Sequence, residues 1–284
     1  MKGFPLIQAI PHPDKVSFTF NGEELVGYVF NPLGSRPFLF PIVGPSGRYV
    51  TRIGHPHDPH GHNHHLSIWL GHQKVNGVNF WEQNSPDAGK QVHRYVSEIF
   101  DGGLMSFLTS RVDWVGPDGD VLLTETRTVG VEFMADTREF FIDLEHEFKP
   151  SVELTLGKTP FGFLGVRVAK TMTVNDGGGA IINSEGMRNE EEIFWKRAEW
   201  CDYSGPISPD EWNGLTLFDH PDNPDHPPHW HVRNDGWMCP SHFLKKGIKL
   251  GTKESLKVKY RIFVHSGKAD PDRFADLFEE FCQE

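Results

Sequence analysis

The residues best suited to chemistry lie in the stretch HPHDPHGHNHHLSIW, residues 55–69, which holds six of the chain's sixteen histidines. Histidine titrates near neutral pH, and neutral imidazole binds transition metals, so the stretch is an acid/base centre, a metal site or a polar loop. In an extended segment His62 and His64 project from one face and His65 from the other. Three further histidines stand in a Pro- and Gly-rich approach, and we expect them to be dispensable: His55, His57 and His60.

A second histidine pair occurs in the segment HWHVR. As a strand, this segment places His229 and His231 on one face with Arg233, and Trp230 on the other. The two pairs could give one divalent metal three or four nitrogen ligands. Those ligands would be His62, His64, His229 and His231. No cysteine pair and no His-Glu-x-x-His spacing accompanies them, so we favour a site without metal or other cofactor, with a divalent metal as the alternative.

The segment around this pair, residues 217–237, is too rich in Pro and Asp to be regular structure. It carries a histidine that could move protons, His220, an amide, Asn223, an aromatic ring, Trp230, and a fixed cation, Arg233. These are the groups that a sugar site uses for proton transfer, hydroxyl contacts and ring stacking. The alternative is a proline-stiffened loop whose Asp and Asn side chains form turns.

Two further charged groups are candidates. Glu125 and Arg127 lie on one strand face and form either a charged pair inside a cleft or a solvated ion pair. Arg36 precedes the apolar run PFLFPIVGP and could project into the same cleft. His146 belongs to the apolar face of residues 139–148, and we expect it to be a hydrogen-bonded core histidine.

The elements that must position these residues are strands, because most of the chain alternates in twos between Gly, Pro, Asn and Asp turns. Residues 91–148 predict a meander of four strands with turns at DGG and GPDG. One amphipathic helix is expected at about 270–282, with Asp270 as its cap. The pattern predicts an all-β fold, a large antiparallel β-sandwich with a short C-terminal helix, forming a single domain over residues 1–284.

Composition narrows the choice of partners. The formal charge is −11 with no Lys/Arg cluster, which argues against a nucleic-acid partner and favours a small-molecule ligand. No window approaches the ~18 consecutive apolar residues of a membrane span, so no membrane is expected. The start lacks the regions of a signal peptide, and three scattered cysteines suit reduced thiols, so a cytoplasmic location is expected. The oligomeric state is left open.

Several motifs together resemble a known family. They are RPFLFPIVGPSG, HNHHLSIWLGHQKVNGVNFW, TPFGFLGVRVAKTM, INSEG, AEWCDYSGP and FDHPDNPDHPPHWHVR, in this order along the whole chain. The chain resembles the bacterial PmoA-like family, which implies a galactose-mutarotase-like supersandwich and a link to sugar metabolism. The family's methane-oxygenase label does not fit a chain without a membrane span. The residues that match its two histidine motifs are His62, His64, His65, Ser67, Trp69, His220, Pro221, Asn223, Pro224, Trp230 and Arg233.

The sequence therefore predicts a carbohydrate-active enzyme that transfers protons on a sugar or keto-sugar, by epimerisation, elimination or hydrolysis. The candidate acid/base residues are His62, His65 and His220. Candidate substrate-binding residues are Arg36, His64, Trp69, Glu125, Arg127, Asn223, Trp230 and Arg233. We expect His62 or His64 to share one cleft with His220 or Arg233. The alternatives are a non-catalytic carbohydrate-binding protein and a histidine-ligated metalloenzyme.

Overall fold

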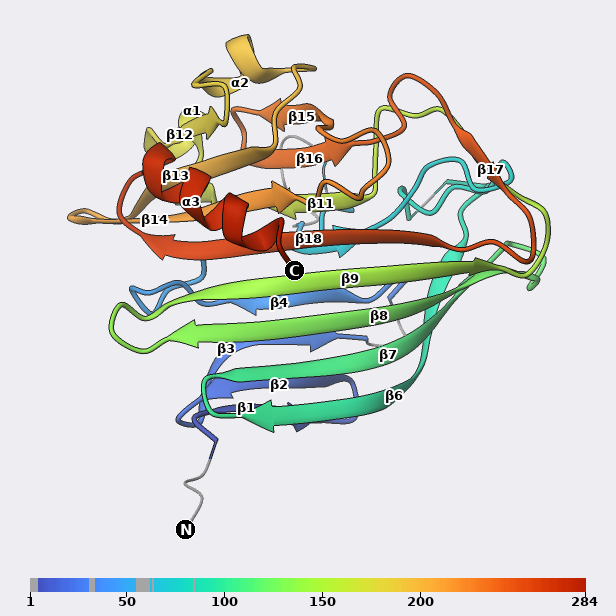
Figure 1. The fold of residues 1–284 in the computed structure, drawn as a ribbon, viewed down its shortest axis with the longest axis horizontal. Coiled ribbons are helices and arrows are strands. Elements are labelled where there is room, and N and C mark those ends of the chain that lie inside the picture. Colours follow the sequence, from blue (N-terminus) through green and yellow to red (C-terminus); the bar gives the residue numbers. More distant parts are fainter. Residues whose placement is uncertain (1–4, 31–33, 55–61, 63, 84) are drawn as a thin grey trace.

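The structure, a computed structural model, describes residues 5–30, 34–54, 62, 64–83 and 85–284. Within these residues the chain folds into two eight-stranded antiparallel sheets that share one hydrophobic core. Figure 1 shows the strands of the second sheet, β6 to β9, crossing in front of β1 to β4 of the first. The predicted all-β sandwich is confirmed.

The first sheet contains the short strand that follows His65 in the chain. Its spatial order is β1 (Ile7–Pro11), β2 (Lys15–Phe20), β3 (Glu23–Val29), β4 (Phe38–Ile42), β5 (Ile68–Leu70), β11 (Leu164–Arg167), β16 (Trp237–Ser241) and β15 (His229–Arg233). Strand β11 therefore joins segments that are about a hundred residues before it and seventy residues after it.

The second sheet contains the predicted meander. Its order is β12 (Ala180–Asn183), β13 (Trp200–Ser208), β14 (Glu211–Asp219), β18 (Leu256–Ser266), β9 (Glu139–Pro150), β8 (Val121–Met134), β7 (Met105–Val115) and β6 (Lys90–Gly102). The four meander strands are paired in sequence, which confirms the prediction from alternation. Strand β18 follows every other strand in the chain but lies inside the sheet, between β14 and β9.

The remaining elements are short. They are the two-stranded pair β10 (Leu154–Leu156) and β17 (Ile248–Leu250), the 3₁₀ turn η1 (Lys170–Met172), and the helices α1 (Val174–Gly177) and α2 (Asn189–Ile193). No helix within the described residues is long and apolar enough to cross a membrane.

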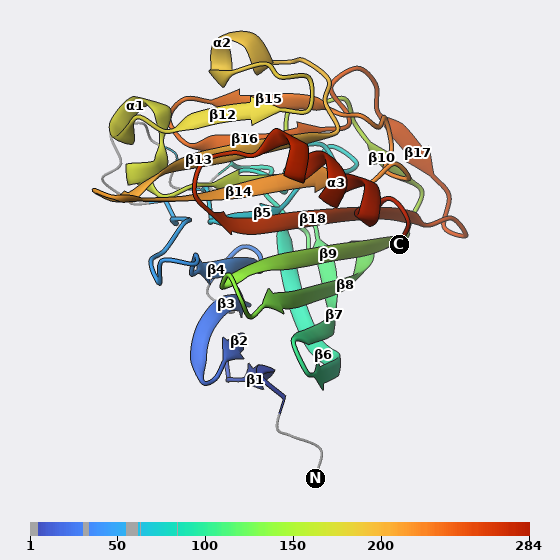
Figure 2. The ribbon, with the colours of Figure 1, turned by 60° about the vertical axis from the view of Figure 1, so that its left-hand side comes forward.

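The predicted C-terminal helix is confirmed as α3 (Pro271–Phe281). Asp270 caps it, its carboxylate accepting a hydrogen bond from the Arg273 amide at 3.2 Å, and proline suits the first turn. Figure 2 shows α3 lying across β14 and β18 on the outer face of the second sheet. Its buried phenylalanines pack there with Phe218 and Phe263, so this helix covers the outer face of the second sheet.

The sequence left Glu125 and Arg127 as substrate-binding candidates, either a charged pair inside a cleft or a solvated ion pair, but the structure buries them between the two sheets. The Arg127 Nε lies 2.6 Å from Glu125 Oε1, and the Trp114 indole donates to Glu125 Oε2 at 2.7 Å. The predicted core histidine, His146, is also buried and its Nδ1 lies 2.7 Å from the same carboxylate. Burial alone would raise the pKa of Glu125, but the charge of Arg127 and the hydrogen bond with His146 lower it to about 2.

We predict that Glu125→Gln destabilises the fold by roughly 3–5 kcal/mol at pH 7, because Arg127 would stay buried without its counter-charge. The pKa of Glu125 falls from an ordinary 4.5 to about 2 on folding, so its stabilisation is complete above pH 4.5 and is lost as pH falls toward 2. Urea unfolding of the wild type should show this acid-dependent loss, and the variant should lack it. Glu147→Gln removes a solvent-accessible ion pair with Lys149, both residues of strand β9, and should change stability little. Equal effects of the two changes would contradict the buried role of Glu125.

Candidate functional site

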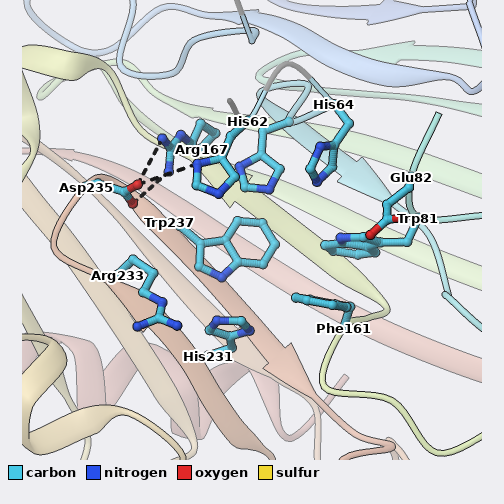
Figure 3. Close-up of a pocket in the computed structure, with 11 residues that line it drawn as sticks. His62, His64, Trp81, Glu82, Phe161, Arg167, His231, Arg233, Asp235 and Trp237 are labelled. Carbon is cyan, nitrogen blue, oxygen red and sulfur yellow. Dashed lines mark hydrogen bonds and ion pairs between the residues drawn. The ribbon is translucent and has the colours of Figure 1, made fainter. Parts of the chain in front are cut away.

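The candidate site is an open cavity of about 430 Å³ at the end of the first sheet that carries β15 and β16. Figure 3 shows its side chains gathered around the indole of Trp237. Its lining combines imidazole rings, aromatic rings and paired charges. The lining residues are His62, His64, His65, Trp81, Glu82, Phe161, Arg167, His231, Arg233, Asp235 and Trp237.

Strand pairing brings these distant residues together. Strand β11 pairs with β5 on one side, where Gly165 faces Trp69, and with β16 on the other, where Arg167 faces Trp237. His64 and His65 precede β5 in the chain, so they lie beside the end of β11. Strand β15 pairs with β16 and alternates as predicted, with Trp230 in the core and both His231 and Arg233 lining the cavity.

His65 forms the centre of an aromatic stack. Its ring lies 4.9 Å from Trp69, 4.7 Å from Trp237 and 4.8 Å from His62, all within 28° of parallel. The side chain is 6% exposed, which leaves it little contact with solvent. The stack therefore fixes the plane in which the neighbouring His62 presents its ring.

A glycine allows the two indoles to approach. A Cβ atom at Gly165 would lie 2.8 Å from Trp69 and 2.8 Å from Trp237, closer than side-chain carbons pack. The strand must therefore have no side chain at this position for both indole rings to pack against it.

We predict that Gly165→Ala pushes the two tryptophans apart and destabilises the protein by about 1–3 kcal/mol, as overpacking does. The near-ultraviolet circular dichroism of the indoles should change with it. Gly130→Ala on strand β8 is the matched control, because a Cβ at Gly130 would meet its nearest atom at an ordinary 3.6 Å. Unaltered spectra in the Gly165 variant would show that the stack does not need the glycine.

The opposite wall of the cavity is also aromatic. Trp81 and Phe161 stack with ring centres 5.5 Å apart and an interplanar angle of 14°. His231 lies 5.6 Å from Phe161 and edge-on to Trp237 at 5.8 Å. Flat apolar faces therefore border the space from more than one side, as in sites that hold a small ring.

A charged pair orients His62. Arg167 is fully buried and donates to both oxygens of Asp235, at 2.9 and 3.4 Å. The same carboxylate lies 3.7 Å from His62 Nδ1, and the His62 side chain is 39% exposed. A carboxylate beside one ring nitrogen favours the tautomer with the proton on that nitrogen, which leaves the other nitrogen able to accept a proton.

Arg233 is held at the rim by its own carboxylate. Its guanidinium pairs with Glu190 of helix α2 and lies 4.5 Å from the centre of the Phe194 ring. Glu190 also accepts a hydrogen bond from the Asn234 amide at 2.9 Å, which ties α2 to the turn between β15 and β16. This cation is therefore fixed and largely neutralised.

Burial keeps several cavity histidines neutral. The pKa of His64 is lowered to about 4 by burial and by the charge of Arg36. Burial and the charge of Arg233 lower the pKa of His231 to about 4. Burial lowers the pKa of His65 far below its usual range. These rings offer hydrogen-bond and proton-accepting nitrogens at pH 7 without adding charge.

We predict that His64, His65 and His231 stay neutral throughout pH 5.5–8 in nitrogen-15 NMR of the imidazole rings. Their desolvated sites disfavour the charged form, whereas Asp202 raises the pKa of the buried His265 against the effect of burial. His265 thus serves as an internal contrast that should hold its proton at higher pH. Protonation of His64 near pH 6.5 would contradict the burial that lowers the pKa of its ring.

Glu82 supplies the remaining carboxylate of the lining. The Asn79 side chain holds it at two points: Asn79 Oδ1 accepts from the Glu82 backbone N–H at 3.0 Å, and Asn79 Nδ2 donates to Glu82 Oε2 at 3.3 Å. Figure 3 shows the Glu82 carboxylate next to Trp81, on the same side of the cavity as His64. A positioned carboxylate and imidazoles around one space can exchange protons with a ligand.

The expected convergence of the two histidine-containing segments occurs through Arg233 and His231, and not through His220. The His220 ring packs edge-on against Phe281 of helix α3, with ring centres 5.0 Å apart. Asn223 donates to the fully buried Asp219 at 2.8 Å and to the Lys259 carbonyl at 2.7 Å. These residues hold the Pro-rich loop against the second sheet, because Asp219 needs buried donors, and they do not line the cavity.

Other expected site residues also lie outside the lining. Trp230 is fully buried and donates to the Ala198 carbonyl at 2.8 Å, and Trp69 is buried behind His65. His229 lies 3.7 Å from Asp225 and does not reach the cavity. Arg36 is buried behind Trp81, to whose carbonyl it donates at 2.5 Å, and burial lowers its pKa to about 9.

Of the four histidines proposed as metal ligands, His62, His64 and His231 line the cavity and His229 does not. Among the described residues no group of three or more His, Cys, Asp or Glu side chains is arranged to hold a metal ion. His55, His57 and His60 lie outside the described residues.

Sequence reasoning missed half of the cavity. Arg167 and Phe161 fall in the motif TPFGFLGVRVAKTM, and Trp81 and Glu82 follow HNHHLSIWLGHQKVNGVNFW, but nothing local marks them as functional. Asp235 is the missed residue that the sequence pattern could have identified. It and Trp237 continue the every-second-residue series of His231 and Arg233 into the next turn and strand.

Fold and site together define an all-β sandwich with a histidine- and aromatic-lined cavity. The chain belongs to the family of unknown function DUF6807, whose model matches residues 15–279. This match does not support the resemblance to the PmoA-like family. A comparison with curated proteins found no match.

Two solved structures are similar in fold. One is a galactose mutarotase-like protein from Lactobacillus casei, with 9% identity, a TM-score of 0.40, and coverage of 91% of this chain and 100% of that one. The other is a galactose mutarotase related enzyme from Lactobacillus acidophilus, with 9% identity, a TM-score of 0.33, and coverage of 93% and 99%. At these scores the likeness says nothing about activity.

Proposed function

We propose that the cavity binds a sugar or keto-sugar of about one ring in size, and that the protein is a carbohydrate-active enzyme using histidine acid/base chemistry. The observation that carries this proposal is the arrangement of His62 between the Asp235 carboxylate and an aromatic-walled cavity. His62 was expected to be an acid/base residue and keeps that role. Its partner in the proposal is Asp235 and no longer His220.

The size and lining of the cavity support a ring-shaped polar ligand. A volume of about 430 Å³ lies in the range of small-molecule sites. Trp81, Phe161 and Trp237 give apolar faces on which the carbon-bound hydrogens of a sugar ring could lie. The neutral imidazoles of His64 and His231 provide donors and acceptors for hydroxyl groups.

The charges of the site support an uncharged ligand. Arg167 is paired with Asp235, and Arg233 is paired with Glu190, so neither cation is left without an anion. Glu82 then leaves the site with one carboxylate more than its cations, which disfavours an anionic ligand. A neutral sugar fits this balance better than a sugar acid.

Proton transfer is the chemistry that the polar groups favour. His62 is partly exposed and oriented by a carboxylate, which are the properties of a general base. Glu82 is a second group able to carry a proton. A non-catalytic binding protein would instead use neutral amides with aromatic rings, and none of the cavity's described lining residues is Asn or Gln.

The proposal is tested by incubating the protein with a panel of neutral monosaccharides and keto-sugars and following isomerisation, elimination or hydrolysis by NMR. On the substrate so found, His62→Gln should lower turnover by roughly 10²–10⁴-fold, because glutamine cannot carry the proton. Phe161→Ala should mainly raise KM, since it removes a stacking face. His229→Gln is the matched control: the residue lies on the same strand as His231 but outside the cavity, and activity should be unchanged.

One result would count against the enzyme, and another against the role of His62. Binding of a sugar in the cavity with no conversion of any panel member would favour the non-catalytic carbohydrate-binding protein. Equal turnover by the wild type and the His62 variant would remove the acid/base assignment while leaving a catalytic cavity. Binding weakened by Phe161→Ala in either case would still place the ligand in this cavity.

A further inference from the structure

A second cavity, of about 320 Å³, lies on the outer face of the second sheet, the face away from the core between the sheets. There β12, β13 and β14 meet the segment before helix α3. Figure 2 shows β12 and the start of α3 on this outer side. Its floor is formed by Ile182 of β12, Ser204 of β13 and the half-buried indole of Trp212 on β14. None of its lining residues is shared with the histidine cavity.

The charged groups of this cavity are of one sign. Lys268 and Arg188 line it, and the described lining contains no acidic residue. The chain as a whole carries a formal charge of −11, so a cavity with two cations and no carboxylate contrasts with the rest of the protein. Neither cation forms an ion pair with another described residue. The carboxylates of Asp202 and Glu192 lie near the cavity, but they accept hydrogen bonds from Ser204 and from the Arg188 amide. A ligand anion would therefore meet two cations and no carboxylate in the lining itself.

Local contacts hold Lys268 above the apolar floor. The Lys268 Nζ lies 4.9 Å from the centre of the Trp212 ring. The preceding residue, Gly267, donates its amide to the Trp212 carbonyl at 2.8 Å, and Ser266 pairs with Asn213. The ammonium is thus held over the indole, so a ligand that reaches the half-buried ring also reaches the cation.

The polar groups under the floor are already satisfied. Ser204 donates to Asp202 at 2.5 Å, and the other oxygen of Asp202 is 2.9 Å from His265 and 3.0 Å from Thr216. Asp202 is therefore engaged by its neighbours and is not available to a ligand. The floor presents an apolar surface, and the cations stand beside it.

We propose that this cavity binds a small carboxylate with a flat apolar body, of the aromatic carboxylate class. The body would lie on Trp212 and Ile182, and the carboxylate would meet Lys268 and Arg188. Charge-assisted contacts of this kind are stronger than neutral hydrogen bonds, and the indole adds a stacking face. The site is separate from the proposed sugar cavity and does not depend on its function.

The test is an NMR titration of the whole protein with benzoate and with benzyl alcohol, a neutral compound of similar shape. The indole N–H signal of Trp212, assigned with Trp212→Phe, should shift with benzoate. Benzoate should bind at least about tenfold more tightly than benzyl alcohol, and Lys268→Gln combined with Arg188→Gln should abolish that difference. Lys246→Gln, an exposed lysine elsewhere, is the control and should leave binding unchanged.

Three outcomes would overturn the proposal. Equal affinity for the acid and the alcohol would show that the cations play no part. Benzoate affinity that survives in the double variant, with shifts at His64 or His231 in place of Trp212, would assign the binding to the histidine cavity. No shift of the Trp212 signal at millimolar benzoate would show that the cavity holds no such ligand. Circular dichroism of the double variant checks that its fold is intact.

Discussion

The pairing of β11 with β5 on one edge and with β16 on the other is the constraint on which the candidate site depends. Through it the histidine segment, the buried Arg167 and the turn that carries Asp235 meet at one end of the first sheet. A shift of one residue in this register would turn Arg167 to the opposite face and separate it from Asp235. Gly165 completes the arrangement, because only a residue without a side chain lets Trp69 and Trp237 lie against the same strand.

The aromatic surroundings determine the chemistry of the polar groups. Burial lowers the pKa of His64, His65 and His231, so these rings stay neutral and act as hydrogen-bonding groups. Both cations of the site are paired with carboxylates. The second cavity has the opposite design, with apolar walls and cations that lack carboxylate partners. One chain thus presents two sites with different preferences for ligand charge.

Much of the fold could be predicted from local pattern, and only part of the site. Alternation in twos located the meander, the spacing of phenylalanines located α3, and the same rule placed His231 and Arg233 on one face. Arg167 and Glu82 escaped prediction because their importance comes from partners far away in the sequence. His220 and Asn223 were misplaced for the converse reason: a polar side chain that satisfies the buried Asp219 looks the same in sequence as one that contacts a ligand.

The interior position of β18 has a consequence for how the protein is made. During synthesis the strands β6 to β9 and the strands β12 to β14 emerge first, each group with one edge that has no neighbour until β18 arrives between them. The sheet can close only after residue 266 has left the ribosome, and α3 can cover it only later still. Such late, long-range pairing slows folding and leaves two unpaired edges exposed to other chains. Slowing of translation before residue 266 would therefore prolong the period in which nascent chains are prone to aggregate.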